Sequence, residues 1–557
     1  MQLLLDSVPL ASLPVKMPFR SGDMKIDLKA QGDLKDRITA KMVVDLAGLV
    51  LDGQAAKEQK GISCTVAGDM DLDMERQTLS MRSGTFAVGP DKGTFEGRVD
   101  NLRKAPAWDI KVSSRGITAG PILARLPVFA GLIPDKLTLK GPASFTLVTT
   151  GNKQAFDLKT TVDMRPMAIT FGKFFNKTAG SPFTFTSSMV KRPEVMEIAS
   201  LDLDLGAIRT KGAGDVRKAG GKSRFQVRIE TNPVPLQTAQ SLIPMLQAFR
   251  PSGNVVVKTV LNGGGGGPLS VNMQASSARM GLVLTRPKEG VQPKARVLEG
   301  PAMADMNAVS IAVDALKKGK ALTAQGSMKS RGGTFMEIPY ATLTGSFSLA
   351  DDLLRVTSFD LAALQGSMKG SASYNLKTKA WTAAPVFNNV QAGAVLDTLT
   401  SFKGVFAGTV TGDLKASGIA GAPALNNLGA QGRIAISKGE WKNFDLAGTV
   451  LGSILGVPGA SEVFGFAPAE VQRYNTTRFE SMDAEVDLAK KVIAVDTMRL
   501  LNISSGKDVD TESSLKGTIS METNEVNLKG IVVLPKRFSQ RVGNRAEAFS
   551  AIMNDQK

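Results

Sequence analysis

The segment "SGDMKIDLKAQG" (residues 21–32) carries the pattern that determines the fold. Its apolar residues Met24, Ile26, Leu28 and Ala30 occupy alternate positions, and glycine stands second and last. Strict alternation has the period of a β-strand with one face buried. The segment therefore predicts a half-buried strand bounded by glycines.

The same twelve-residue pattern recurs three more times along the chain. The further copies are "KGPASFTLVTTG" (140–151), "SGNVVVKTVLNG" (252–263) and "AGTVTGDLKASG" (407–418). Apolar residues keep the same phase in each copy, whereas a slip of one residue would turn them to the other face. Repetition in one phase predicts a repeat protein whose strands present one continuous apolar face.

Each copy follows a short apolar stretch that contains or adjoins proline or has helical spacing. These stretches are "PLASLPV" (9–15), "PILARLPV" (121–128), "PLQTAQSLIPML" (235–246) and "AVLDTLTSF" (394–402). They predict one or two turns of amphipathic helix at each repeat lead-in. Upstream of three lead-ins lie a glycine-punctuated strand, a polar turn and an aromatic-bearing strand, with Trp108, Phe225 and Trp381. This fixed order predicts an array rather than a set of unrelated domains.

The residue types present argue against catalysis. The chain has no histidine and one cysteine, Cys64. Without histidine it lacks the usual general base and the commonest metal ligand, and a lone cysteine needs a basic partner to act as a nucleophile. The acids of "DMDLDMER" (69–76) alternate with apolar residues, which places them on the wet face of a strand. We therefore expect that the protein is not an enzyme and has no cofactor and no metal site.

Charge gives a weaker indication of the partner. The net charge is +17, from 68 basic and 51 acidic residues spread over turns and polar strand positions. A nucleic-acid-binding protein more often has a basic patch interleaved with stacking aromatics, so we expect no nucleic-acid partner. Dispersed positive charge is compatible with anionic lipid head groups. No run of about twenty apolar residues is present to span a bilayer.

The repeats also suggest how the chain is organised. Residues 1–345 are predicted to form repeated β-groove units, and residues 346–557 a C-terminal region. Because residues 9–32 match the second half of a repeat, we expect the chain to begin in mid-unit. Between about 264 and 345 the spacing lengthens, which predicts an insertion. Its opening, "VLNGGGGGPLS" (260–270), lacks the lysine of a phosphate-binding loop and predicts a hairpin tip or bulge.

Two helical candidates lie in the C-terminal region. "DLAGTVLGSILGV" (445–457) is predicted as a core helix or a cap on the sheet end, and residues 538–557 as a final helix. Both are short compared with the strand tracts. With so little helix to cover it, a one-sided apolar sheet must curl on itself or leave a hydrophobic channel. The expected fold is mostly β: an elongated, twisted antiparallel repeat sheet curled into a taco-like groove, with strands of about six or seven residues.

Three passages in the C-terminal third carry a family resemblance. They are "GVFAGTVTGDLKASGIAGAPALNNLGAQGRIAISKGEWKNFDLAGTVLGSIL" (404–455), "TTRFESMDAEVDLAKKVIAVDTMRL" (476–500) and "SLKGTISMETNEVNLKGIVVLP" (514–535). In their glycines and alternation they resemble the C-terminal region of the AsmA-like family, over roughly residues 345–535. The resemblance implies a periplasmic location, an inner-membrane anchor helix near the N-terminus, and phospholipid movement towards the outer membrane or assembly of that membrane. We expect no such anchor helix within these residues, which is a departure from the family pattern.

Together these observations predict a periplasmic lipid-transfer conduit that moves phospholipids between inner and outer membranes in envelope biogenesis. The expected partners are phospholipid acyl chains, the inner membrane through a missing or upstream anchor, and the outer membrane. The binding site is expected to be a stripe, for which we select Met24, Ile26, Leu28, Phe145, Leu147, Phe225, Val227, Ile229, Val255 and Val257. Each of these residues also fits ordinary packing in a closed core. The alternative function is a non-enzymatic scaffold or assembly factor for outer-membrane proteins, with client strands paired to a sheet edge.

Overall fold

The computed structural model divides into two compact units. They comprise Met1–Ala275 with Leu316–Gly319, and Ser276–Ala315 with Lys320–Lys557. The residues described are 2–9, 19–33, 35–51, 62–118, 137–172, 174–219, 222–264, 267–283, 303–319, 321–335, 338–394, 404–420, 427–443, 458, 476–489, 491–505, 508–520 and 525–533. The main boundary between the units falls between Ala275 and Ser276. The sequence suggested a boundary at 345/346, between the repeated β-groove units and the C-terminal region.

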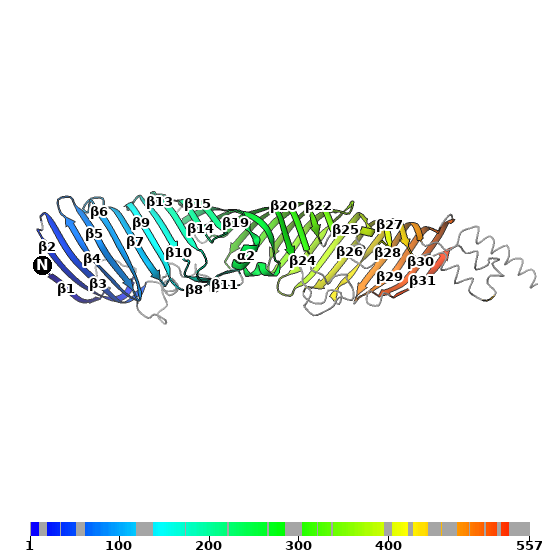
Figure 1. Ribbon diagram of the computed structural model, residues 1–557, viewed down its shortest axis with the longest axis horizontal. Helices are drawn as coiled ribbons and strands as arrows, with labels where there is room; N and C mark the ends of the chain where they lie inside the picture. The colour runs from blue at the N-terminus through cyan, green and yellow to red at the C-terminus, as the bar shows by residue number, and fades with distance from the viewer. Residues whose placement is uncertain are drawn as a thin grey trace, which may run out of the picture. The chain divides into compact units, whose positions relative to one another are not determined.

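The first unit is built on an antiparallel sheet whose strands follow one another in chain order (Figure 1). Each strand pairs with the one before it, except that β7 pairs with β9, β10 with β13 and β16 with β18. The strands are β1 (Gln2–Pro9), β2 (Phe19–Gly32), β3 (Arg37–Leu51), β4 (Ile62–Asp73), β5 (Thr78–Val88), β6 (Asp91–Asp100), β7 (Ala107–Ile117), β9 (Ala143–Asn152), β10 (Phe156–Asp163), β13 (Thr184–Lys191), β14 (Val195–Asp204), β15 (Arg209–Ala219), β16 (Lys222–Thr231) and β18 (Ser252–Gly264).

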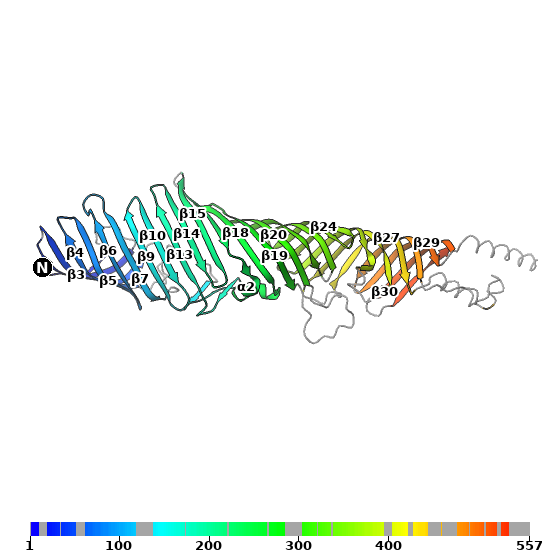
Figure 2. The ribbon, with the colours of Figure 1, turned by 45° about the horizontal axis from the view of Figure 1, so that its top comes forward.

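A smaller body of structure sits at one edge of this sheet, where Figures 1 and 2 show α2 beside the strand ends. We call it the edge module. It contains a three-stranded sheet and a short helical segment: β8 (Leu137–Lys140), β11 (Ala168–Phe171), β12 (Phe175–Lys177), β17 (Val234–Pro235), α2 (Leu236–Leu242) and η3 (Pro244–Ala248). Met167 and Ile169 are buried against Ala143 of the large sheet, and α2 contacts β12, β17 and β18.

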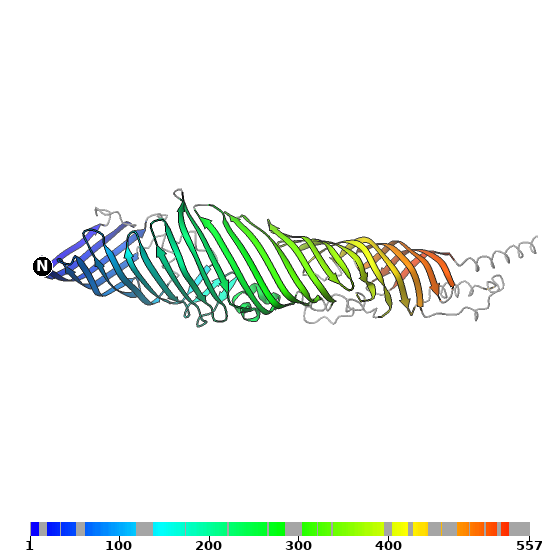
Figure 3. The ribbon, with the colours of Figure 1, turned by 90° about the horizontal axis from the view of Figure 1, so that it is seen from above.

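The second unit contains a consecutive antiparallel run from β21 to β31 (Figure 3). Its strands are β21 (Ala321–Phe335), β22 (Ile338–Ala350), β23 (Leu353–Ala363), β24 (Gly366–Asn375), β25 (Ala380–Gln391), β26 (Phe406–Ile419), β27 (Gly429–Lys442), β28 (Thr476–Ala489), β29 (Val492–Ser505), β30 (Asp508–Ser520) and β31 (Val526–Val533). Two further strands, β19 (Leu269–Val283) and β20 (Met303–Lys318), hold residues of both units.

The fold class expected from the sequence is confirmed: the described part of the chain is mostly β, with antiparallel strands and few short helices. The strands curve within each unit, and the sheet does not close on itself, which is consistent with a groove (Figure 3). The lead-in at 235–246 forms α2 and η3 as predicted. The lead-ins at 9–15, 121–128 and 394–402, and the helices expected at 445–457 and 538–557, lie wholly or mostly outside the described residues.

The predicted strand length of six or seven residues is wrong. β18 has 13 residues, β21 has 15 and β20 has 16. At about 3.3 Å per residue, a 15-residue strand spans roughly 50 Å. The interval 264–345, expected as an insertion, holds several of these long strands, so strand length accounts for much of the wider repeat spacing. At the glycine run, Gly267 donates to the Gly264 carbonyl at 2.8 Å, as a tight turn requires.

Several glycines lie inside the long strands, opposite an aromatic ring on the neighbouring strand. Gly84 pairs with Phe95, and a Cβ on this glycine would lie 2.5 Å from the ring. Gly326 and Phe347 have the same relationship, also at 2.5 Å. The ring occupies the space that a side chain on the neighbouring strand would fill, which compensates for the poor packing of a strand glycine.

Candidate functional site

One face of the first sheet carries a row of residues that are directly opposed from strand to strand. The row starts at Leu28 in β2, passes through Leu147 in β9, and ends at Ile229 in β16. Its members are Leu28, Met42, Gly68, Gly84, Phe95, Val112, Leu147, Thr160, Ser187, Leu201, Gly212 and Ile229. Directly opposed residues in a sheet share a face, so three of the selected residues lie on one apolar stripe.

Parallel rows flank this stripe and hold other selected residues. Ile26 connects through Val44, Val66, Phe86, Gly93 and Ser114 to Phe145. Val227 and Phe225 lie two and four residues from Ile229 on β16, which keeps them on the same face. Met24 opposes Leu46, which opposes Cys64.

Val255 and Val257 occupy a different setting. Val255 pairs with Val234 of β17, which is buried in the edge module, and the Val257 N–H donates to the Thr231 hydroxyl at 2.9 Å. Both residues have the same strand parity as Leu261, which opposes Val227. They therefore belong to the apolar face but lie at its covered end.

Most of this face is only half-buried. Of the ten selected residues, Met24 alone is fully buried, at 9% exposure, and the other nine keep an intermediate exposure. The most buried apolar side chains of the unit lie instead in or beside the edge module, such as Met167 at 1% and Ala239 at 3%. A closed core buries its central residues most completely. The middle of this sheet face is accessible to an apolar ligand.

The second unit repeats the arrangement on its own sheet. A row of opposed residues crosses β22 to β30, with large side chains at both ends and alanines between them. It consists of Phe347, Val356, Ala372, Ala383, Ala416, Ala430, Leu488, Ile493 and Ile519. Beside its later strands lies a fully buried cluster that includes Phe479, Met498 and Leu500. The alanines leave room above the sheet that larger residues would fill.

The opposite face of both sheets is polar and carries ion pairs across neighbouring strands. Lys111 pairs with Glu96 at 3.0 Å, and Arg433 with Glu485 at 2.7 Å. Both pairs join residues directly opposed in the ladder. Exposed pairs of this kind contribute little stability individually, but they fix the strand register and keep this face in water.

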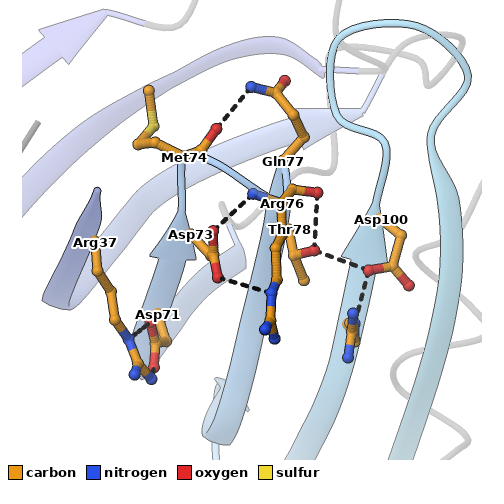
Figure 4. A network of polar contacts seen from close by, with 9 residues as sticks. Arg37, Asp71, Asp73, Met74, Arg76, Gln77, Thr78 and Asp100 are labelled. Carbon is orange, nitrogen blue, oxygen red and sulfur yellow. Dashed lines mark hydrogen bonds and ion pairs between the residues drawn. The ribbon is translucent and has the colours of Figure 1, made fainter. Parts of the chain in front are cut away.

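Figure 4 shows a polar network where β3 to β6 end, at the edge of the first sheet. Arg37 binds the Asp71 carboxylate with two donors, one at 2.7 Å, and Thr78 donates to Asp100 at 3.0 Å. The hydrogen bond from Arg37 lowers the pKa of Asp71, and that from Arg98 lowers the pKa of Asp100. The lowered pKa values keep both carboxylates charged at neutral pH, which makes them poor proton donors. Their contacts instead connect the ends of neighbouring strands.

A shallow hollow of about 740 Å³ lies over β23 to β28. Its lining includes six residues of the second row: Val356, Ala372, Ala383, Ala416, Ala430 and Leu488. Their neighbours along the strands, among them Arg355, Lys415 and Asp487, also line it. The hollow therefore lies over the alanine row, where small side chains leave room for an apolar group.

The described residues offer little for covalent or metal chemistry. Cys64 is half-buried on the apolar face opposite Leu46 and Val88, and burial raises the pKa of its thiol. Within the described ranges, no three acidic, histidine or cysteine side chains gather to hold a metal ion. No helix in the described part of the chain has the length and hydropathy needed to cross a bilayer. The arrangement is suited to binding aliphatic groups.

Comparison with models of known families and with curated proteins gives no match for this chain. The function must therefore be argued from the sheet faces themselves. Sequence reasoning identified the apolar face but missed two features of it. The aromatic–glycine pairs join residues on neighbouring strands, and the alanine stretch of the second row comes from four separate strands.

Proposed function

We propose that this chain is a lipid-transfer conduit of the AsmA-like kind. Its apolar sheet faces hold phospholipid acyl chains and pass them between the inner and outer membranes of a Gram-negative envelope. The observation that supports this most directly is the row from Leu28 through Leu147 to Ile229, which is continuous across twelve strands and half-exposed at all its members except Gly84 and Ser187. A face of this kind is costly in water unless an apolar partner covers it.

The binding energy comes from burial rather than from a particular polar contact. Transfer of a methylene group from water stabilises a complex by about 0.8 kcal/mol, so ten buried methylenes contribute on the order of 8 kcal/mol. Neighbouring positions along a row offer similar apolar surface. A bound chain therefore moves from one position to the next with little change in free energy, which is the property that transport requires.

Native mass spectrometry with lipid extraction tests this proposal on protein purified from a Gram-negative periplasm. We expect phospholipid to co-purify with the wild type and to be lost in Val227→Asp. An acyl chain that covers the new carboxylate would remove it from water, at a large cost in desolvation free energy. Val386→Asp is the control, since Val386 is 42% exposed and lies on the polar face between Pro385 and Phe387. That variant should retain lipid.

A folded wild-type protein that carries no lipid after gentle purification would contradict the conduit. It would favour the scaffold for outer-membrane proteins instead. Retention of lipid by a folded Val227→Asp variant would show that lipid binds elsewhere.

A further inference from the structure

The edge module has an inner and an outer side with opposite properties. Its inner side is tightly packed: Met167, Leu236 and Leu242 are all buried, at 1%, 9% and 8% exposure. Its outer side exposes two aromatic rings and a methionine. Phe174 is 57% exposed, Met245 47% and Phe249 41%. Elsewhere among the described residues of the first unit, the exposed large hydrophobic residues are Val43 and Leu316.

These exposed side chains lie on elements that adjoin one another. Phe174 lies in the turn between β11 and β12, and its ring centroid is 5.6 Å from that of Phe171. Met245 lies in η3, and Phe249 is the first residue after the end of η3. Helix α2 contacts both β12 and η3, which joins the two parts of the outer side. Single exposed apolar residues are ordinary, but a group on one module indicates a contact surface.

The charge of the module distinguishes the kind of partner. Its described residues come from three connections: 137–142, 164–183 without 173, and 232–251. These residues include no acidic side chain and four basic ones: Lys140, Arg165, Lys177 and Arg250. Lys177 is buried, and Arg165 pairs with Asp163. The whole chain has 68 basic to 51 acidic residues, so the excess is concentrated here. Lys140 and Arg250 are exposed and make no ion pair with the described residues.

We propose that the outer side of the edge module docks on the surface of an anionic phospholipid membrane. Aromatic and aliphatic side chains beside basic residues form the combination that binds at the boundary of head groups and acyl chains. Phe174, Met245 and Phe249 enter that boundary, and Arg250 and Lys140 pair with lipid phosphates. This docking does not depend on whether the apolar sheet faces carry lipid.

Vesicle co-sedimentation of the full chain tests the proposal, with phosphatidylcholine vesicles prepared with or without phosphatidylglycerol. We expect binding to the anionic vesicles that weakens at high salt. The triple variant Phe174→Ser, Met245→Ser, Phe249→Ser should lower the partition coefficient about tenfold or more. Arg250→Glu should lower it about fivefold or more, for the anionic vesicles only. Val43→Ser, a change at an exposed valine outside the module, should leave it unchanged.

Two results would overturn the proposal: a wild type that does not sediment with anionic vesicles, or a folded triple variant that binds as the wild type does. Circular dichroism establishes whether the triple variant folds. Arg250→Glu tests vesicle binding independently, because it changes an exposed charged residue and leaves the apolar side chains in place. Val227→Asp separates this proposal from the conduit, because it should remove acyl lipid without changing vesicle binding. A wild type that carries acyl lipid but does not bind anionic vesicles would count against the docking proposal and leave the conduit standing.

Discussion

Gly439 on β27 lies directly opposite Phe479 on β28, and a Cβ on the glycine would lie 1.9 Å from Cζ of the ring. Phe479 is 3% exposed and belongs to the buried cluster of the second unit. The ring thus occupies the position of the side chain that glycine lacks. The same relationship joins Trp381 to Gly418, so this pairing is a recurring way of filling the apolar face.

Gly439→Ala should destabilise the second unit because the added methyl group displaces a buried ring. We expect a loss of roughly 1–3 kcal/mol in the free energy of unfolding. Gly429→Ala is the matched control, since its new Cβ would meet Ser417 Oγ at an ordinary 3.5 Å. Urea unfolding followed by fluorescence measures both. Equal midpoints for the two variants would contradict this account of the pair.

Lys177→Met should destabilise the edge module. Lys177 is 0% exposed, and its ammonium group donates to the carbonyls of Arg165 at 3.1 Å, Met167 at 2.6 Å and Thr178 at 3.1 Å. Loss of these donors leaves buried acceptors unpaired, at a cost of roughly 2–4 kcal/mol. Limited proteolysis should then cut within 164–183 much faster than in the wild type. Lys140→Met, on an exposed lysine of the same small sheet, should change the cleavage rate little.

Val43 and Val44 give a matched pair for the apolar face, because adjacent strand residues point to opposite sides. Val44 opposes Ile26 and Val66 on the apolar face, whereas Val43 is 37% exposed on the polar face. Val44→Asp should reduce binding of a fluorescent fatty-acyl probe by about tenfold or more. Val43→Asp should bind the probe as the wild type does. Equal loss in both variants would show that the probe does not report on this face.

Cys64 is the single cysteine of the chain and lies on the apolar face, so its alkylation reports on that face directly. Burial raises the pKa of the thiol, which lowers the fraction of reactive thiolate at neutral pH. We expect iodoacetamide to react more slowly than with free cysteine, and the rate to keep rising above pH of about 8.5. Added phospholipid should slow the reaction further. A rate unaffected by lipid would indicate that no acyl chain lies near Cys64.

Arg37→Gln tests the strand-end network through its pH dependence. Arg37 lowers the pKa of Asp71 in the folded protein, so their pairing stabilises the fold above the ordinary carboxyl pKa of about 3.9. That contribution disappears as the pH falls through the lowered pKa of Asp71. The variant should therefore have a slightly lower melting temperature at neutral pH, and the difference should vanish in strong acid. A difference that grows on acidification would contradict the assignment.

The repeated segments show how far the sequence could be interpreted. Alternation at Met24, Ile26 and Leu28 correctly predicted a strand with one apolar face. The glycines in the same segments were assigned to strand ends and turns, and that assignment was only partly correct. Gly32 has φ of +137°, where a Cβ would lie 2.1 Å from the Arg37 carbonyl oxygen, as a strand-end glycine requires. Gly418 instead lies beneath the Trp381 ring within a ladder.

The edge module shows what sequence patterns could not predict. The sequence predicted the short helix at 235–246 but gave no sign that β8, β11 and β12 leave the main ladder. Their apolar residues alternate as those of any other strand do: Leu137 and Leu139 in β8 are one example. β8 pairs with β11 across the intervening strands β9 and β10, so this pairing joins residues distant in sequence.

The sequence by itself determined the strand period, the apolar and polar faces, and the antiparallel repeat class, because a two-residue period is a local property of the chain. The tertiary structure decided which residues oppose one another, and therefore how long the strands are, where a ring replaces a missing side chain, and which part of the apolar face stays open. Those features depend on cross-strand register, which joins residues distant in sequence and is fixed only when the whole ladder packs together.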